Sequence, residues 1–358
     1  MDEIPIAGFK RLQDQLLLSL KDPETCLDEK LIDEVQVQLT AEEIIPIARP
    51  RLLPLLTKIL PSYPKNPKLL SELSQKLLRS VGFRQVLDFA SEENLVLALK
   101  SPFPAANLLG IDIVSKASWA PSHTTILSNM KPLILAFIQT WLCSPDVAVG
   151  EAATQTLGDL LEMDCDCRKA LSSSTSTRVK NLNVSSEIPL GQGLLWRRIF
   201  QDQDIYNQLF SLCDLNAAGK EDCCMERRQI SIAQGRLLQL LPRLATFNFQ
   251  IISQSQFPMV EETYIGQPSG ILFYAATKMI NKNDLLMHMI LITFFGDLLS
   301  MLSKETISPS DFNYLSSLLN QVAHEDISLK ESIEESVRNP ETAPELLELL
   351  SRLTLNNG

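Results

Sequence analysis

The sequence predicts an all-α fold, a HEAT/armadillo-like helical-repeat solenoid, and three observations lead to this prediction. Apolar residues make up 45% of the 358-residue chain, which is enough to bury an extended core. Leu is the main apolar residue, whereas aromatic residues amount to only 6%. Because unbranched side chains favour helices and aromatic or β-branched side chains favour strands, this composition indicates helices. The third observation is an internal repeat.

The repeat consists of two segments, SPFPAANLLGIDIVSKAS (residues 101–118) and SPDVAVGEAATQTLGDLL (residues 144–161). Each opens with Ser-Pro and continues with small and apolar residues at helical spacing. They are offset by 43 residues, within the range of about 40 to 47 that HEAT and armadillo repeats show. We predict a third copy at residues 283–299, where the tetrapeptide Gly-Asp-Leu-Leu recurs.

The second copy has the signals of a helix start. Ser144 is placed as the N-cap, Pro145 takes the first helical position, and the helix dipole favours Asp146 in the first turn. One face then carries small or apolar residues, at Val149, Ala152, Ala153, Leu157 and Leu160. Partner helices are expected before the three copies, at residues 92–100, 125–143 and 270–280, with a further pair at residues 194–213 and 225–245.

We predict a single α-solenoid domain over residues 1–358. Residues 1–90 are expected to form N-terminal helical repeats, residues 91–302 the clearest HEAT-like repeats, and residues 303–358 the C-terminal capping helices. Two loop insertions interrupt the repeats, at about residues 164–193 and 246–269, and the first is rich in Ser, Thr and Gly. Such insertions are either binding loops or tolerated surface connections.

The charge of the chain argues against two classes of partner. With a net charge of −11, it lacks the excess of Lys and Arg that neutralises phosphates in nucleic-acid-binding proteins or that meets acidic membranes. The N-terminus has no basic region followed by an apolar one, and the most apolar stretch, residues 285–302, is interrupted by His288, Gly296 and Asp297. We therefore expect a cytoplasmic protein, with the nucleus as an alternative, that contacts neither membranes nor nucleic acid directly.

Charge is also uneven near the N-terminus. Residues 1–43 hold four Lys or Arg and eleven Asp or Glu, a net charge of −7, whereas residues 49–84 hold eight Lys or Arg and one Glu, a net charge of +7. This step either steers an acidic partner onto the basic segment or is neutralised between adjacent solvated faces.

Catalytic motifs are missing from the sequence. The three histidines, His123, His288 and His324, lie outside any HExxH motif, and the chain has no GxSxG elbow and no GxxxxGK[ST] loop. The segment Gly191-Gln192-Gly193 lacks the third glycine of a dinucleotide site. We predict that the protein is not an enzyme and needs no cofactor.

The cysteines point to reduced thiols. Their number, seven, is odd, as expected of a protein without a disulfide framework. The pairs Cys165/Cys167 and Cys223/Cys224 lack the CxxC spacing of zinc sites. No metal site is predicted.

Two polar rows are the candidate protein-binding residues. The rows lie on the second helices of two repeats, which usually line the concave binding side of a solenoid, although ordinary solvent exposure explains either row equally well. The candidates are Glu151, Gln155 and Asp159 in the first row and Gln229, Arg236, Gln239 and Arg243 in the second.

Four stretches of the chain resemble one family of HEAT-repeat proteins. They are LVLALKSPFPAANLLGIDIVSKAS (residues 95–118), the Ser-Pro-Asp copy, GLLWRRIFQDQDIYNQLFSLC (residues 193–213) and IAQGRLLQLLPRLA (residues 232–245), and the most distinctive is the helix start at residues 194–200. The family is that of the proteasome regulatory-particle assembly chaperones, which comprises proteasome non-ATPase regulatory subunit 5 of animals and its fungal relatives, also labelled as DNA mismatch repair proteins. The resemblance covers a little over half of the chain.

The resemblance implies a chaperone that is not itself a proteasome subunit. It would clasp the C-terminal domain of one AAA ATPase subunit of the 19S base and delay the docking of that subunit until its partners assemble. Two alternatives stay open: another HEAT/armadillo scaffold or adaptor in transport or regulation, and a DNA-repair accessory factor. The acidic balance of the chain argues against direct DNA contact by the latter.

Overall fold

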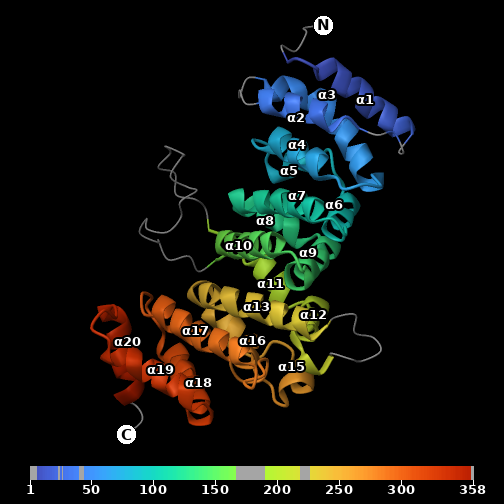
Figure 1. The fold of residues 1–358 in the computed structure, drawn as a ribbon. Helices are drawn as coiled ribbons and strands as arrows, with labels where there is room; N and C mark the ends of the chain where they lie inside the picture. Colours follow the sequence, from blue (N-terminus) through green and yellow to red (C-terminus); the bar gives the residue numbers. More distant parts are fainter. Residues whose placement is uncertain are drawn as a thin grey trace. The chain divides into compact units, whose positions relative to one another are not determined.

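The computed structural model describes residues 6–22, 25, 27–39, 44–166, 190–217 and 226–355. Throughout these ranges every regular element is a helix, which confirms the all-α class (Figure 1). The chain divides into two compact units, residues 1–140 with 146–156 and residues 141–145 with 157–358. The region that we expected to form one domain therefore has two centres of packing.

The first unit consists of short helices that pack on near neighbours in chain order. Its elements are α1 (Phe9–Lys21), α2 (Glu29–Gln38), α3 (Ile45–Ile59), η1 (Leu60–Ser62), α4 (Lys68–Leu78), α5 (Phe83–Val86), α6 (Glu92–Leu99), α7 (Pro104–Ser115), η2 (Lys116–Trp119), α8 (Pro121–Ser128), most of α9 (Lys131–Cys143) and the first part of α10 (Val147–Met163). Helix α1 packs on α2 and α3, while α4 contacts α2, α3 and α7. The apolar faces of α1–α4 share one hydrophobic core.

The second unit follows the same rule. It contains the end of α10, α11 (Leu194–Phe200), α12 (Gln203–Cys213), η4 (Leu215–Ala217), α13 (Arg227–Phe247), α14 (Phe249–Ser253), α15 (Pro258–Ile265), α16 (Ile271–Thr277), α17 (Leu285–Leu302), α18 (Pro309–Glu325), α19 (Ile327–Arg338) and α20 (Pro344–Leu355). Helix α13 lies at its centre and packs on α12, α14, α16 and α17. Because α13 is covered from several directions, more of its surface is buried than a single apolar face would require.

Most of the predicted repeat helices are present. The expected helices at residues 92–100, 101–118, 225–245, 270–280 and 283–299 correspond to α6, α7, α13, α16 and α17. The start of α10 differs from the prediction, because the helix begins at Val147 and its N-cap is Asp146, not Ser144. The Oδ1 atom of Asp146 accepts a hydrogen bond from the N–H of Val149 at 3.0 Å, so the carboxylate satisfies an N–H of the first turn.

Two segments predicted as single helices are broken. Residues 125–143 divide between α8 and α9, whose axes differ by 96°. Pro132 lies in the first turn of α9. A residue without an N–H is tolerated there, whereas in the interior of one long helix it would break the hydrogen-bond pattern. Residues 194–213 divide between α11 and α12 at Asp202, whose side chain caps α12 by accepting from the N–H of Asp204 at 3.2 Å.

The predicted insertion at residues 246–269 is largely helical, so the expectation of an irregular loop was wrong. It contains α14 and α15, which are held by the fully buried side chain of Glu261. This carboxylate accepts hydrogen bonds from the Tyr206 hydroxyl at 2.8 Å, the Ser255 hydroxyl and the backbone N–H groups of Gln256, Phe257 and Ser269. Five donors offset the cost of burying its charge. Of the other insertion, residues 167–189 lie outside the described residues.

Among the described helices, α17 is the most apolar. By length and composition it could cross a membrane, as could α8 and α9 if the bent pair counted as one span. In the structure α17 packs on α13, and its buried residues include Leu291, Phe294, Phe295 and Leu298. Core helices of globular proteins satisfy the same length and composition test.

Candidate protein-binding surface

The candidate row on α10 is only partly a free surface. Glu151 and Gln155 are exposed, on the side opposite the buried residues Val149 and Ala153, as predicted. The third member, Asp159, is half-buried and forms an ion pair with Arg243 of α13. Glu151 and Gln155 therefore lie at the surface, whereas Asp159 serves internal packing.

The candidate row on α13 needs a larger correction, because Arg236 is only 8% exposed. Its Nη1 atom donates to the carbonyl oxygens of Trp141 at 2.7 Å and Leu142 at 3.4 Å, in the last turn of α9. A cation at this position satisfies carbonyls that have no partner within their helix and complements the negative end of the helix dipole. Arg236 is therefore a structural C-terminal cap of α9 rather than a binding residue.

The two glutamines of this row also differ from one another. The Oε1 atom of Gln229 accepts from the N–H of Glu226 at 3.4 Å, which places Gln229 in the cap of α13. Gln239 is exposed. Among the four predicted residues of α13, Gln239 thus presents its side chain to solvent, and none of the contacts described above involves it.

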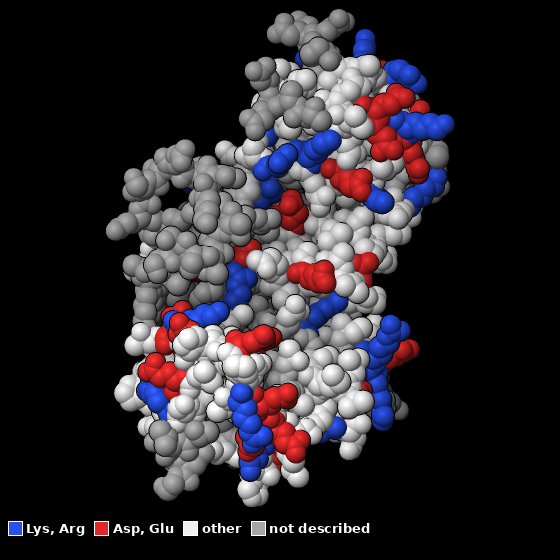
Figure 2. Space-filling view, turned by 60° about the vertical axis from the view of Figure 1, so that its left-hand side comes forward, with Lys and Arg blue, Asp and Glu red and all other residues white. Residues whose placement is uncertain are grey.

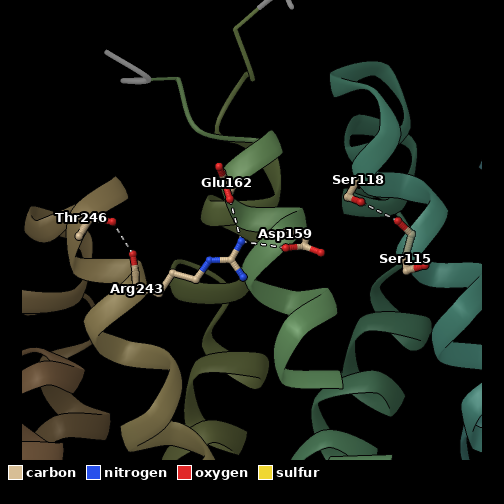
Figure 3. A network of polar contacts seen from close by, with 6 residues as sticks. All are labelled: Ser115, Ser118, Asp159, Glu162, Arg243 and Thr246. Carbon is tan, nitrogen blue, oxygen red and sulfur yellow. Dashed lines mark hydrogen bonds and ion pairs between the residues drawn. The ribbon is translucent and has the colours of Figure 1, made fainter. Parts of the chain in front are cut away.

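Arg243 connects the two rows (Figure 3). Its Nη2 atom donates to Asp159 Oδ1 at 2.8 Å and to Glu162 Oε2 at 2.7 Å, so one guanidinium bridges two carboxylates of α10. Burial alone lowers the pKa of Arg243, but the hydrogen bonds and charges of Asp159 and Glu162 outweigh burial and raise the pKa above its ordinary value. Arg243 stays charged and fastens α13 to the end of α10.

Gly158 makes room for this bridge. A Cβ atom at position 158 would lie 2.2 Å from Arg243 Nη1, closer than any real contact. The matching glycine of the third copy, Gly296, has nothing within 4 Å of its Cβ position, and Asp297 beside it has a raised pKa because of partial burial. The shared Gly-Asp-Leu-Leu sequence therefore forms a helix–helix bridge in one copy and a solvated surface in the other.

The distinctive start of α11 is explained by a buried cap. The Oδ2 atom of Asp164, which is fully buried, accepts from the N–H groups of Leu195 at 2.6 Å and Trp196 at 3.1 Å. The indole N–H of Trp196 donates to the carbonyl of Leu161 at 2.8 Å. Asp164 thus ties the start of α11 to the end of α10, across a gap in the described sequence.

Gly191 and Gly193 belong to the same connection. A Cβ atom at Gly191 would lie 2.2 Å from the carbonyl carbon of Asp164, and Gly193 has a φ of +64° that favours glycine. Gly193 also donates its N–H to the carbonyl of Asp164 at 2.9 Å. Close approach to the backbone of Asp164 accounts for Gly191, and the left-handed backbone conformation accounts for Gly193.

The residues that could bind a metal ion or act as nucleophiles are dispersed. Within the described part of the chain, no three His, Cys, Asp or Glu side chains gather as metal ligands would. Cys213 is fully buried, which raises the pKa of its thiol, and Cys165 is buried too, while Cys167, Cys223 and Cys224 lie outside the described residues. A buried thiol with a raised pKa is a poor nucleophile.

His288 has a structural partner. Its Nε2 atom lies 2.8 Å from Asp326 Oδ2, and Lys282 Nζ lies 3.6 Å from the same oxygen. Asp326 is also the N-cap of α19, because its Oδ1 atom accepts from the N–H of Leu329 at 3.1 Å. The group therefore joins α17 to α19.

Part of the basic segment at residues 49–84 is used in packing. Arg49 donates to the carbonyl of Leu77 at 2.9 Å and to Ser80 Oγ at 2.9 Å, and Lys76 Nζ donates to the carbonyl of Gln36 at 2.5 Å. On the face drawn in Figure 2, Lys and Arg side chains lie close to Asp and Glu side chains at the N-terminal end. Arg49 and Lys76 are therefore engaged in internal contacts, although their partners are uncharged oxygens.

Comparison with protein-family models and with curated proteins gives no match to this chain.

Proposed function

We propose that this chain is a non-catalytic, protein-binding chaperone for assembly of the 26S proteasome regulatory-particle base. In this proposal a HEAT/armadillo-like α-solenoid clasps the C-terminal domain of one AAA ATPase subunit of the base. The nature of the partner comes from the family resemblance of residues 95–118, 144–161, 193–213 and 232–245. The repeat architecture and the binding role have physical support of their own.

The order of helix packing supports a solenoid. Within each unit the main contacts join helices close in chain order, such as α4 with α7 and α13 with α17. Repeat proteins have this property because each repeat touches only its neighbours. The first residues of α7 and α10, Pro104 and Val147, are 43 residues apart, which is a HEAT or armadillo period.

The exposed polar face of α10 is the observation that carries the binding role. Glu151 and Gln155 project from a helix whose opposite face is anchored by buried Val149 and Ala153. Because the helix is fixed by its apolar face, the two polar side chains are held at a constant spacing of one turn. A partner can bind them without ordering a flexible segment, which lowers the entropic cost of association.

The partner is tested by affinity purification of the full chain followed by mass spectrometry. Recovery of one base ATPase with its neighbouring subunits is the expected result. Importin cargo or phosphatase subunits would instead indicate another adaptor, and DNA binding with a steep salt dependence would indicate a repair factor.

The surface is tested with the double variant Glu151→Lys and Gln155→Lys. Capture of the ATPase C-terminal domain is expected to fall at least tenfold, whereas far-UV circular dichroism stays unchanged because both residues are exposed. The matched control, Glu331→Lys with Glu335→Lys, changes two exposed residues of α19 at the same spacing and is expected to bind normally. Equal capture by both variants would contradict this surface. Arg236 and Arg243 are left unchanged, because the structure assigns them internal contacts.

A further inference from the structure

The first unit contains a large apolar cavity. Its volume is about 350 Å³, and residues of α3, η1, α4, α6 and α7 surround it. A cavity of about 150 Å³ in a protein core holds one benzene molecule. The cavity therefore has room for about two large apolar side chains, whereas close-packed interiors leave few voids larger than a water molecule.

The cavity opens at the surface. Two of its lining residues, Phe89 and Leu97, are 38% and 55% exposed, although both are large and apolar. Other lining residues, such as Leu95 and Leu109, are buried. Exposed apolar side chains grouped around an apolar hollow are typical of a protein-interaction site.

One wall of the cavity is held rigidly. The Nδ2 atom of Asn107 is hydrogen-bonded to the carbonyl oxygens of Ala98, Leu99 and Ser101 at 3.1, 2.7 and 3.0 Å, which fixes the turn between α6 and α7. The hydroxyl of Thr140 donates to the carbonyl of Leu99 at 2.9 Å. Because this wall is already ordered, binding costs little conformational entropy.

The charges around the cavity favour an acidic ligand. The lining includes the exposed residue Lys100 and no carboxylate. On the α3 and α4 side, the exposed residues Lys58 and Lys68 directly follow the lining residues Thr57 and Pro67 in the sequence. Among the described residues, Lys58, Lys68 and Lys100 form no ion pair. Three carboxylates directly adjoin lining residues in the sequence, those of Asp88, Glu93 and Asp112, and Asp112 forms an ion pair with Lys116 at 3.8 Å.

We propose that this cavity binds an acidic segment of a partner protein. The segment inserts a Leu or Phe side chain beside Phe89 and Leu97 and places its own Asp and Glu side chains toward Lys58, Lys68 and Lys100. Apolar burial provides most of the affinity, and the lysines select the acidic segment and its orientation. The proposal does not depend on the ATPase partner, because neither Glu151 nor Gln155 lines the cavity.

The ligand chemistry is tested by fluorescence anisotropy with the full chain. The probe is a fluorescein-labelled peptide of Asp, Glu and Ser that contains one Leu and one Phe. We expect it to bind at least tenfold more tightly than a peptide with Lys in place of Asp and Glu, and than one with Ala in place of Leu and Phe. Equal affinity for the three peptides, or no binding of the first, overturns the proposal.

The location is tested with exposed residues, so that folding is preserved. Leu97→Glu, and separately Lys58→Glu with Lys68→Glu, are expected to weaken binding of the acidic peptide at least tenfold. The matched control, Asp88→Lys with Glu93→Lys, is expected not to weaken it. If the control weakens binding as much as the lysine variant, the assigned orientation is wrong. If Leu97→Glu instead abolishes self-association of the chain in sedimentation velocity, the occupant is a second copy and the proposal fails.

Discussion

Replacing Asp164 by Ala is expected to destabilise the second unit strongly. The carboxylate is fully buried and is the acceptor for the N–H groups of Leu195 and Trp196. Each buried N–H left without an acceptor costs about 1–3 kcal/mol. Because water can enter the space left by the carboxylate and satisfy part of this loss, we expect a total of about 2–4 kcal/mol.

The measurement is urea denaturation followed by far-UV circular dichroism. Hydrogen exchange gives a local readout, because the N–H groups of Leu195 and Trp196 should exchange faster in the variant. Asp164→Asn keeps an oxygen acceptor but loses the charge, so its loss of stability should be intermediate.

Asp159→Ala is the matched control for this experiment. Asp159 lies on α10, five residues before Asp164. Its replacement removes only one of the two carboxylates that bind Arg243. Its cost should stay below about 1 kcal/mol, as for half-exposed ion pairs. If Asp164→Ala costs no more than Asp159→Ala, Asp164 is not the cap of α11.

Three further outcomes follow from internal contacts. Arg236→Met should lower the free energy of unfolding by about 1.5–3 kcal/mol in urea denaturation, because the carbonyls at the end of α9 lose a charged hydrogen-bond donor. An unchanged free energy of unfolding would contradict the role of Arg236 as a cap. Gly296→Ala should raise the melting temperature through a gain of about 1 kcal/mol in helix propensity, whereas Gly158→Ala should bring no gain because its Cβ displaces Arg243. Burial by itself raises the pKa of Asp326, but its hydrogen bonds with Leu329 and His288 and the nearby Lys282 lower this pKa below the ordinary value of 3.8. Its stabilisation is therefore complete above about pH 4 and is lost as the pH falls further, so Asp326→Asn should flatten stability against pH in this acidic range.

The helices were largely predictable because their signals are local. Composition and the 43-residue offset between the two Ser-Pro segments predicted α7 and α10, and the apolar run at residues 285–302 predicted α17. Helix ends were less predictable, since several residues compete for each cap. At α10, Ser144 and Asp146 are both good N-caps, and only the position of the first turn decided for Asp146.

The candidate surface was predictable only in part. Glu151, Gln155 and Gln239 are exposed as expected, because spacing along a helix fixes which side chains share a face. Arg236 lies in an equally polar row, yet it is buried because α13 is covered by helices on several sides. No local pattern marks this difference, since the neighbouring helices come from other parts of the chain.

The sequence by itself determined the helical class and the positions of most helices, both of which depend on composition and on residues a few positions apart. Only the tertiary structure decided which polar residues are internal. Arg243 meets Asp159 across more than eighty residues, and Glu261 meets Tyr206 across more than fifty. Burying a charge is favourable only where such partners converge, and convergence is a property of packing rather than of sequence spacing.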